Sequence, residues 1–399
     1  MGAVVAMKLR TVRDLSPRGL KILLRADLNV PLAAGRVAED GRIRAVLPTV
    51  RWLEERGARV AVLSHLGRPD GKVVEELRMA PVAKRFGELL GTDVRALPEC
   101  VGDEVARAVE GLPPGGVVVL ENVRFHPEEE ENDPAFAREL AAPFDAFVND
   151  AFATAHRAHA STVGVARFLP AYAGFLMERE VEVLSGIRDN PRRPYHILVG
   201  GKKARDKLGV LTDLLPRVDG FLIGGGVAFT FLAAQGHRVG KSVVDESLVD
   251  TIRALLRAAK ERGTEIVLPE DLVVARELAA NAETVVVPAN AIPDGWMGLD
   301  IGPATVERFA GVVARAGTVV WTGPLGAFEH PPFAAGTAAV ARALVSSPAF
   351  TVVGGGETGE AVEKLGLADR FGYVSTGGGA TLDFLRGKSM PALEPLRAA

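Results

Sequence analysis

The sequence predicts an α/β protein of two domains, each built on a mainly parallel sheet. Short apolar runs typical of strands alternate with segments of helical periodicity along the whole chain, which is the pattern of parallel sheets. At 399 residues the chain is longer than one hydrophobic core usually supports, so we expect two domains. In such sheets ligands bind at the carboxyl ends of the strands, and we look for site residues there.

Composition narrows the class of protein. The net charge of -3 argues against a general nucleic-acid binder, and no apolar run is long enough for a membrane span. Cys100 is the single cysteine, which excludes an internal disulfide framework and fits a reducing compartment. Residues 1–6 are too short for a signal peptide and lack its basic flank. We therefore expect a cytosolic protein that starts at Met1 or Met7.

A glycine–lysine stretch lies almost at the midpoint of the chain. The apolar run Ile197–Val199 ends in two glycines, and a cluster of cations follows. Glycine lets backbone N–H groups approach a phosphate, and the N-terminus of a helix adds partial positive charge. A helix starting near Ala204 puts Lys203 at that N-terminus and Lys207 one turn later. A plain strand-to-helix turn with a solvated basic surface explains this stretch alone equally well.

Polar residues follow the first expected strand, Lys21–Leu24. Asp27 and Asn29 lie two apart on an extended segment, so their side chains point the same way. An acceptor beside an amide suits hydroxyl groups better than phosphate. An Asx-type turn before Pro31 is the alternative.

Cations follow the next strands of the first half. His65, Gly67 and Arg68 come after Val60–Leu63, and Arg42 precedes an expected helix. Two further arginines follow expected strands: Arg124 after Val117–Leu120 and Arg157 after Phe147–Asn149. Together these residues predict a basic pocket for a small, multiply charged anion. The acidic run Glu128–Glu131 is expected to be a solvated loop rather than a metal site.

The second half repeats a strand followed by glycines. The expected strands Phe221–Ile223, Val319–Trp321, Val352–Val353 and Tyr373–Thr376 each end in a glycine-containing turn. Strands that end in glycines on one side of a sheet leave room for a large flat ligand and its phosphates. Neither the P-loop spacing nor a clean G-x-G-x-x-G with its acidic partner is present, which argues against P-loop NTPases and standard dehydrogenases. Between the halves, Ala173–Ile187 is expected to be a connecting helix.

A basic anion pocket in one domain and a glycine-lined face in the other favour phosphoryl transfer between separately held substrates. Such chemistry depends on positioning and charge neutralisation more than on a protein nucleophile. It also requires the domains to close and exclude water, because hydrolysis otherwise competes.

Ordered motifs along the chain resemble those of the phosphoglycerate kinase family, from about Lys8 to the end. They are Arg25–Pro31, Ser64–Pro69, Leu120–Phe125, Asn149–Ser161, Ala173–Glu178, Gly224–Phe231, Trp296–Asp300 and Ser375–Ala380. The resemblance implies two similar-sized Rossmann-like domains joined by an interdomain helix in a bilobal, hinge-bending kinase. The implied boundaries are 1–172 for 3-phosphoglycerate binding, 173–190 for the helix, 191–380 for nucleotide binding, and 381–399 for a segment returning to the first domain.

The resemblance also implies roles for individual residues. Asp27 and Asn29 hold the glycerate end of 3-phosphoglycerate. The phosphate and carboxyl groups fall to Arg42, His65, Arg68, Arg124 and Arg157, with Leu66 and Gly67 on the same loop. On the nucleotide side the implied residues are Gly201, Lys203, Lys207, Gly225, Gly226, Gly298, Glu329, Gly355, Gly356, Glu357 and Thr358. Arg42, Lys203 and Lys207 are the implied catalytic residues, and Glu357 is the implied ligand of Mg²⁺.

The implied reaction is reversible in-line transfer from 1,3-bisphosphoglycerate to MgADP, giving 3-phosphoglycerate and MgATP, by a monomer without nucleic-acid or membrane partners. Three positions depart from the family's pattern: Lys202 replaces a small residue, Thr322 an asparagine, and Glu357 an aspartate. All three fall on the nucleotide side. The alternative is therefore a kinase-derived protein that binds phosphoglycerate but has impaired turnover.

Overall fold

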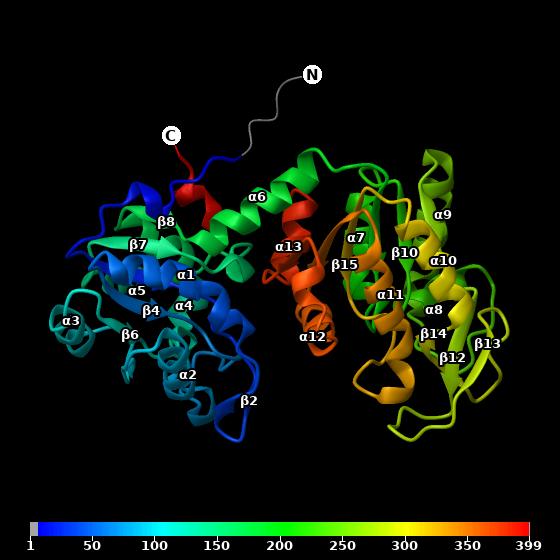
Figure 1. Ribbon diagram of the computed structural model, residues 1–399, viewed down its shortest axis with the longest axis horizontal. Helices are drawn as coiled ribbons and strands as arrows, with labels where there is room; N and C mark the ends of the chain where they lie inside the picture. The colour runs from blue at the N-terminus through cyan, green and yellow to red at the C-terminus, as the bar shows by residue number, and fades with distance from the viewer. Residues whose placement is uncertain (1–6, 399) are drawn as a thin grey trace. The chain divides into compact units, whose positions relative to one another are not determined.

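The computed structural model describes residues 7–398, which form two compact units (Figure 1). The first unit contains the chain up to Ser185 together with residues from Lys388 onward, and the second contains Gly186–Gly387. Residues 1–6, which bear on the signal-peptide and start-site expectations, lie outside the described residues. Each unit holds a six-stranded parallel sheet, so the predicted α/β class with two mainly parallel sheets is confirmed.

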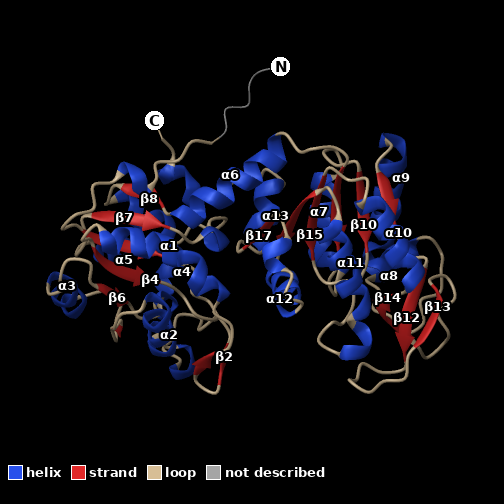
Figure 2. Ribbon diagram, in the orientation of Figure 1, coloured by secondary structure: helices blue, strands red, loops and turns tan. Residues whose placement is uncertain are grey.

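The sheet of the first unit has the strand order β5-β6-β4-β1-β7-β8, and all neighbours are parallel. Its strands are β1 (Lys21–Arg25), β4 (Arg59–Leu63), β5 (Arg95–Ala96), β6 (Val117–Val119), β7 (Ala146–Asn149) and β8 (Ala171–Ala173), with a hairpin of β2 (Leu32–Ala33) and β3 (Arg36–Val37) beside them. Its helices are α1 (Gly41–Glu55), α2 (Ala80–Leu90), α3 (Asp103–Glu110), α4 (Pro127–Glu131) and α5 (Pro134–Ala141). Figure 2 shows these helices and the strands that they flank.

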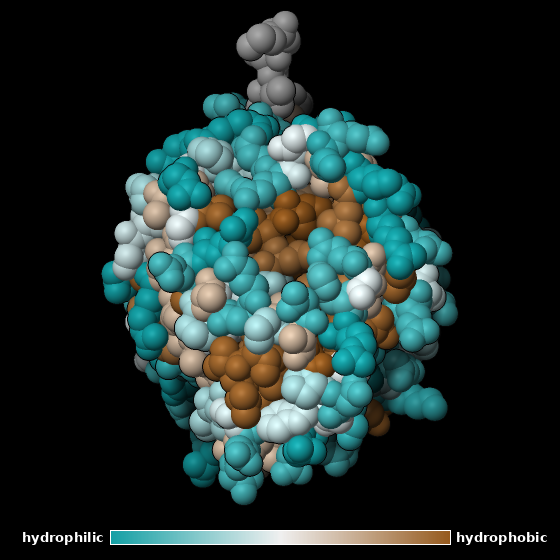
Figure 3. Space-filling view, turned by 90° about the vertical axis from the view of Figure 1, so that its right-hand side faces the viewer, coloured by the Kyte–Doolittle hydropathy of each residue, from teal (hydrophilic) through white to brown (hydrophobic). Residues whose placement is uncertain are grey.

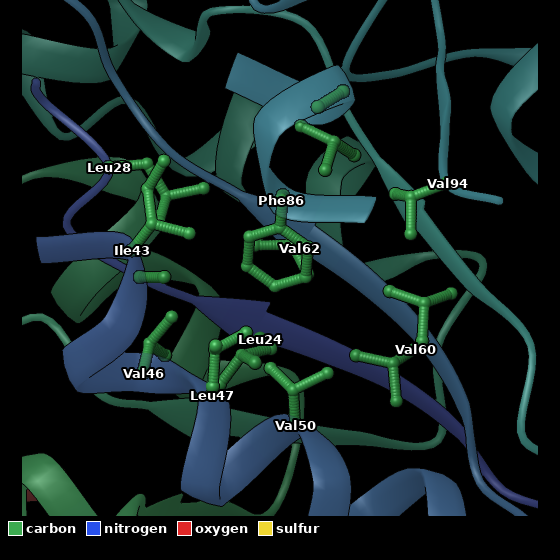
Figure 4. Close-up of a cluster of buried hydrophobic side chains, with 14 of the residues drawn as sticks. Leu24, Leu28, Ile43, Val46, Leu47, Val50, Val60, Val62, Phe86 and Val94 are labelled. Carbon is green, nitrogen blue, oxygen red and sulfur yellow. The ribbon is translucent and has the colours of Figure 1, made fainter. Parts of the chain in front are cut away.

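Apolar side chains cover both faces of this sheet. Leu24 and Val62 pack against Phe86 of α2 in the core shown in Figure 4. The neighbouring residues Leu23 and Ala61 point to the opposite face and are equally buried. Burial on both faces explains why these strands are continuous Val, Ile and Leu runs rather than alternating patterns.

The second unit repeats this architecture with the order β11-β10-β9-β15-β16-β17, again parallel throughout. Its strands are β9 (Tyr195–Val199), β10 (Gly220–Ile223), β11 (Glu265–Val267), β15 (Thr318–Thr322), β16 (Phe350–Gly354) and β17 (Tyr373–Ser375). Its helices are α7 (Ala204–Leu214), α8 (Val227–Ala234), α9 (Val249–Arg262), α10 (Pro303–Val313), α11 (Ala335–Ser346), α12 (Gly356–Lys364) and α13 (Gly379–Leu385).

A three-stranded antiparallel sheet in the second unit was not predicted. It has the order β13-β12-β14, from β12 (Asp271–Ala275), β13 (Val285–Pro288) and β14 (Met297–Ile301). Val285 and Val286 on its edge strand are 44% and 52% exposed. Figure 3, which looks onto this side of the molecule, shows apolar side chains gathered in patches among polar ones. Weak alternation and exposed valines explain why the sequence pattern did not reveal this sheet.

The connecting helix begins later than the sequence indicated. Ala173 is the last residue of β8, and helix α6 runs from Phe175 to Asp189. Gly174 lies between β8 and α6. Only glycine fits there, because a Cβ at this position would lie 2.2 Å from the Asp150 carboxyl group. Asp150 Oδ1 accepts the backbone N–H of Met177 at 2.9 Å. A buried carboxylate therefore satisfies one of the free N–H groups at the start of α6.

The expectation of a solvated acidic loop was wrong. Residues 127–131 form the short helix α4, and the Glu129 side chain is fully buried. Asp133 caps the helix that follows by accepting the N–H groups of Ala135 and Phe136. No group of three or more metal-ligating side chains occurs among the described residues.

The C-terminal residues return to the first unit. Arg10 N–H donates to Leu396 O at 2.7 Å, and Ala398 N–H donates to Lys8 O at 2.9 Å. Within residues 7–398, no helix combines the length and apolar character needed to cross a membrane.

We predict that Asp150→Asn removes a pH-dependent destabilisation. Burial raises the pKa of Asp150 to about 7, so the folded protein disfavours the ionised form. The free energy of unfolding therefore falls as the pH rises from about 4 towards 7. The difference in free energy of unfolding, variant minus wild type, should therefore be roughly 2 kcal/mol larger at pH 8 than at pH 5. Urea unfolding followed by circular dichroism at both pH values measures this, and equal differences would refute it.

Candidate active site

In the first unit, the loops after β1 and β4 are joined by side-chain hydrogen bonds. Asn29 Oδ1 accepts the N–H of Gly67 at 2.8 Å. Asp27 is 5% exposed and pairs with Arg42 from the start of α1. Its Oδ1 also accepts Asn29 N–H at 3.2 Å, which is an Asx-type turn. The Asx-type turn is therefore present, and it fixes the position of the two polar side chains.

Arg124 lies against the same loop. It follows β6 on the short 3-10 helix η3 (Val123–Phe125), is 6% exposed, and donates to Gly67 O at 3.0 Å. Asn122 holds Leu66 from both sides, accepting its N–H at 3.2 Å and donating to its carbonyl at 2.8 Å. The loop carrying His65 and Gly67 is thus fixed by residues that follow two other strands.

His65 is buried among positive charges. Burial, together with the charges of Arg25, Arg124 and Arg42, holds the pKa of His65 well below its usual value. The imidazole is therefore neutral at physiological pH. The sequence predicted that His65 is one of the cations of the pocket. Burial lowers the pKa of Arg124, and the nearby charge of Arg157 lowers it further.

The structure places several of the residues predicted to bind an anion close to one another. Arg42, His65 and Arg124 share one electrostatic environment, and the exposed Arg157 borders it. Arg157 Nε donates to His156 Nε2 at 3.2 Å. Arg68 is exposed on the loop after β4, and no ion pair to it is found within residues 7–398.

In the second unit, the carboxyl ends of the strands border a cavity of about 480 Å³. That volume suits a small-molecule ligand. The predicted residues Gly201, Gly225, Gly226, Gly298, Glu329 and Glu357 line it. Sequence reasoning missed its apolar wall, which includes Phe229, Leu272, Met297, Leu299 and Leu325, as well as Lys241 and His330. Leu272 and Met297 come from the antiparallel sheet that the sequence did not predict.

Glycines allow the cavity loops to approach one another closely. A Cβ on Gly225, where φ is +57°, would lie 2.9 Å from Gly201 N, and one on Gly200 would lie 2.4 Å from Gly323 O. Gly201 N–H in turn donates to Pro324 O at 2.8 Å. The loops after β9, β10 and β15 are therefore held in backbone contact that no larger residue permits.

Polar groups gather near the N-termini of α7 and α12. Lys207 Nζ donates to Thr322 Oγ1 at 2.9 Å, and Gly323 N–H donates to Thr358 Oγ1 at 2.7 Å. Burial lowers the pKa of Lys207, and the Glu357 charge opposes that shift. Lys203, which is exposed, is the N-cap residue of α7, and the half-buried Gly355 is the N-cap residue of α12. Gly356, the first residue of α12, is also exposed.

The three residues that depart from the family's pattern are Lys202, Thr322 and Glu357, and all three lie at or near the cavity. Lys202 lines the cavity but is exposed, and its backbone carbonyl lies where a Cβ on Gly226 would clash. Thr322 provides an acceptor for Lys207 in place of an amide. Glu357 is exposed in the first turn of α12 and lines the cavity.

These features describe a class: a two-domain α/β protein with a cluster of cationic side chains on one unit and a glycine-lined cavity on the other, as expected of a kinase with two separately held substrates. A family model described as phosphoglycerate kinase matches residues 12–388. A phosphoglycerate kinase from Moorella thermoacetica is 53% identical over 386 residues, covering 97% of this chain and 98% of the relative. A wheat relative (Triticum aestivum) described as phosphoglycerate kinase, cytosolic, is 49% identical over 394 residues, covering 98% of each chain.

Solved structures of phosphoglycerate kinases have the same fold as this chain. That of phosphoglycerate kinase from Coxiella burnetii has a TM-score of 0.85 at 41% identity, and that from Pyrococcus horikoshii has a TM-score of 0.88 at 34%. Each covers 97% of this chain and 98% of the other. The chain belongs to the phosphoglycerate kinase family. The predicted activity, phosphoryl transfer to a carboxyl acceptor, is confirmed, and the impaired binding protein is not favoured.

We predict that Gly298→Ala disrupts the cavity. A Cβ there would lie 2.3 Å from Phe229 Cζ, so the ring must move. Overpacking of this kind typically costs about 1–3 kcal/mol, which should lower the melting temperature measured by calorimetry. Gly311→Ala in α10 is the matched control, because the nearest atom to its Cβ is 4.0 Å away; it should leave stability unchanged or raise it. Equal melting temperatures for the two variants would contradict this account.

Proposed function

We propose that the first unit binds 3-phosphoglycerate through the pocket formed by its strand-end loops. Arg42, Arg124 and Arg157 neutralise the carboxyl and phosphate groups, with Arg68 as a further cation on the loop after β4. Asp27 and Asn29 meet the glycerate hydroxyl. The buried position of Arg124 supports this assignment, because a partly desolvated cation binds an anion more strongly than a solvated one.

The second unit binds the nucleotide in its cavity. The base lies between the Gly201, Gly225 and Gly298 backbone and the apolar wall, and Glu329 meets the ribose hydroxyls. The phosphates extend towards Lys203, Lys207 and the N-terminus of α12, where Gly355, Gly356 and Thr358 lie. One observation carries this proposal: Lys207, Thr322 and Thr358 converge beside the glycine-lined cavity.

Glu357 is the residue that would hold Mg²⁺. A single exposed carboxylate fits this ion, because Mg²⁺ commonly combines one or two carboxylates with substrate phosphates and water. When bound, the ion neutralises charge on the phosphate chain. The protein's own part is to position the donor with Lys203 and Lys207 and the acceptor with Arg42.

Transfer is direct, without a covalent enzyme intermediate. The single cysteine is buried and its thiol pKa is raised well above the usual value by that burial, so it is no nucleophile. The two substrates react when the domains that begin as 1–172 and 191–380 close around the helix 173–190, with the chain from Lys388 onward returning to the first domain. Closure excludes water. We further propose a cytoplasmic monomer.

Coupled turnover tests this function. ATP- and Mg²⁺-dependent conversion of 3-phosphoglycerate is followed as NADH oxidation by glyceraldehyde-3-phosphate dehydrogenase. We expect wild-type turnover and a fall in kcat of at least about a hundredfold in Lys203→Ala, because a transition-state charge loses its partner. A folded wild-type protein that binds 3-phosphoglycerate without turnover would overturn the proposal.

A second prediction concerns Thr322. Thr322→Val keeps the shape of the side chain but removes the acceptor of the Lys207 hydrogen bond. The KM for MgADP should rise about fivefold, as expected for losing one such bond, and Thr322→Ser should stay near the wild-type value. Steady-state kinetics in the ATP-forming direction measures both, and a KM unchanged in Thr322→Val would show that the hydroxyl does not position Lys207.

A further inference from the structure

A fully buried arginine lies directly behind His65. Arg25 is the last residue of β1, and its side chain is 0% exposed. Its guanidinium donates to Ser161 Oγ through Nε at 2.9 Å and to the Ala26 carbonyl through Nη1. Its Nη2 lies 3.2 Å from His65 Nδ1.

The chain of hydrogen bonds continues to a buried carboxylate. Ser161 Oγ donates to Glu129 Oε1 at 2.6 Å, and Ser161 N–H donates to Oε2 at 2.8 Å. Burial favours a raised pKa for Glu129, but the nearby His159, the Arg25 charge and Ser161 outweigh it and hold that pKa below its usual value. Glu129 is therefore ionised, and its charge compensates the buried guanidinium.

The direction of each hydrogen bond in this chain is fixed. A guanidinium only donates, so His65 Nδ1 must be the acceptor of the Arg25 bond. The imidazole proton is consequently on Nε2, because a proton on Nδ1 would face an N–H group. His65 Nε2 contacts no acceptor within residues 7–398.

The charges around His65 favour the same state. Arg25 from β1, Arg42 from α1, Arg124 from η3 and His159 beside Glu129 all oppose a second proton on the ring. His65 is therefore a neutral donor, and the positive charge lies one residue deeper, on Arg25.

We propose that Glu129, Ser161 and Arg25 form a positioning relay that fixes His65 as the neutral Nε2–H tautomer and directs that N–H at the substrate anion. The relay residues are not catalytic, since they act only through His65. The proposal rests on the proposed function, in which His65 binds the carboxyl or phosphate of phosphoglycerate. It adds that His65 contributes a directed Nε2–H hydrogen bond to the substrate rather than a positive charge.

Nuclear magnetic resonance of protein labelled with ¹⁵N at the histidines tests the tautomer. Two-bond ¹H–¹⁵N spectra distinguish the two neutral tautomers and the cation, and His65→Ala identifies the signal. We expect the Nε2–H pattern for His65 at every pH from 8 to 5.5. A cation at pH 6, or the Nδ1–H tautomer, would overturn the proposal.

Ser161→Ala tests the relay without leaving a bulky charge unpaired. It removes the hydroxyl between Arg25 and Glu129. We expect mixed tautomers or a titrating His65, and a KM for 3-phosphoglycerate raised at least about tenfold with a smaller change in kcat. Ser185→Ala is the matched control, because its buried hydroxyl has no hydrogen-bond partner among the described residues. An unchanged His65 pattern and KM in Ser161→Ala would overturn the relay.

One further variant separates this inference from the proposed function. His65→Ala should raise the KM for 3-phosphoglycerate. If it leaves KM unchanged, His65 does not bind substrate, and the part of the proposal that aims Nε2–H at the anion is overturned. The wild-type tautomer is read without substrate, so the relay itself is judged independently.

Discussion

The buried guanidinium of Arg25 is the interaction on which the first unit's site depends. A charge at the carboxyl end of a central strand, fully removed from water, requires a compensating anion and hydrogen-bond partners for its N–H groups. Glu129 supplies the anion, so α4 must fold inward, and Ser161 supplies the link. His65 completes the arrangement as the acceptor of Nη2. The anion site that we propose therefore rests on a charge that is itself fully buried.

In the second unit, the main constraint is the close approach of the loops around the cavity. The loops after β9, β10 and β15, which border its cavity, approach one another to distances that only glycine allows. The apolar wall comes from α8 and from the antiparallel sheet through Phe229, Leu272 and Met297. The polar end comes from the N-termini of α7 and α12. Thr322 shows how a departure is accommodated there, because its hydroxyl accepts a hydrogen bond from Lys207.

The sequence predicted the parallel sheets and most strand ends, because continuous Val, Ile and Leu runs followed by glycine or a polar residue are strong signals. It mistook Glu129 for a solvated residue, since a run of glutamates gives no local sign of a buried partner more than a hundred residues away at Arg25. It placed the start of α6 two residues early, because the Asp150–Gly174 contact that separates β8 from the helix is tertiary. The apolar cavity wall was missed because its residues come from β12, β14, α8 and the loop after β15, which only the tertiary fold brings together.

We propose that each unit binds its own substrate without a contribution from the other unit. Calorimetric titration of 3-phosphoglycerate in the absence of nucleotide tests this most directly, with the wild type, Arg124→Met and Gly298→Ala compared under one set of conditions. We expect the wild type and Gly298→Ala to bind with dissociation constants equal within about twofold, and Arg124→Met to bind at least about tenfold more weakly. Failure of the wild type to bind without nucleotide, or equal binding by Arg124→Met, would contradict it.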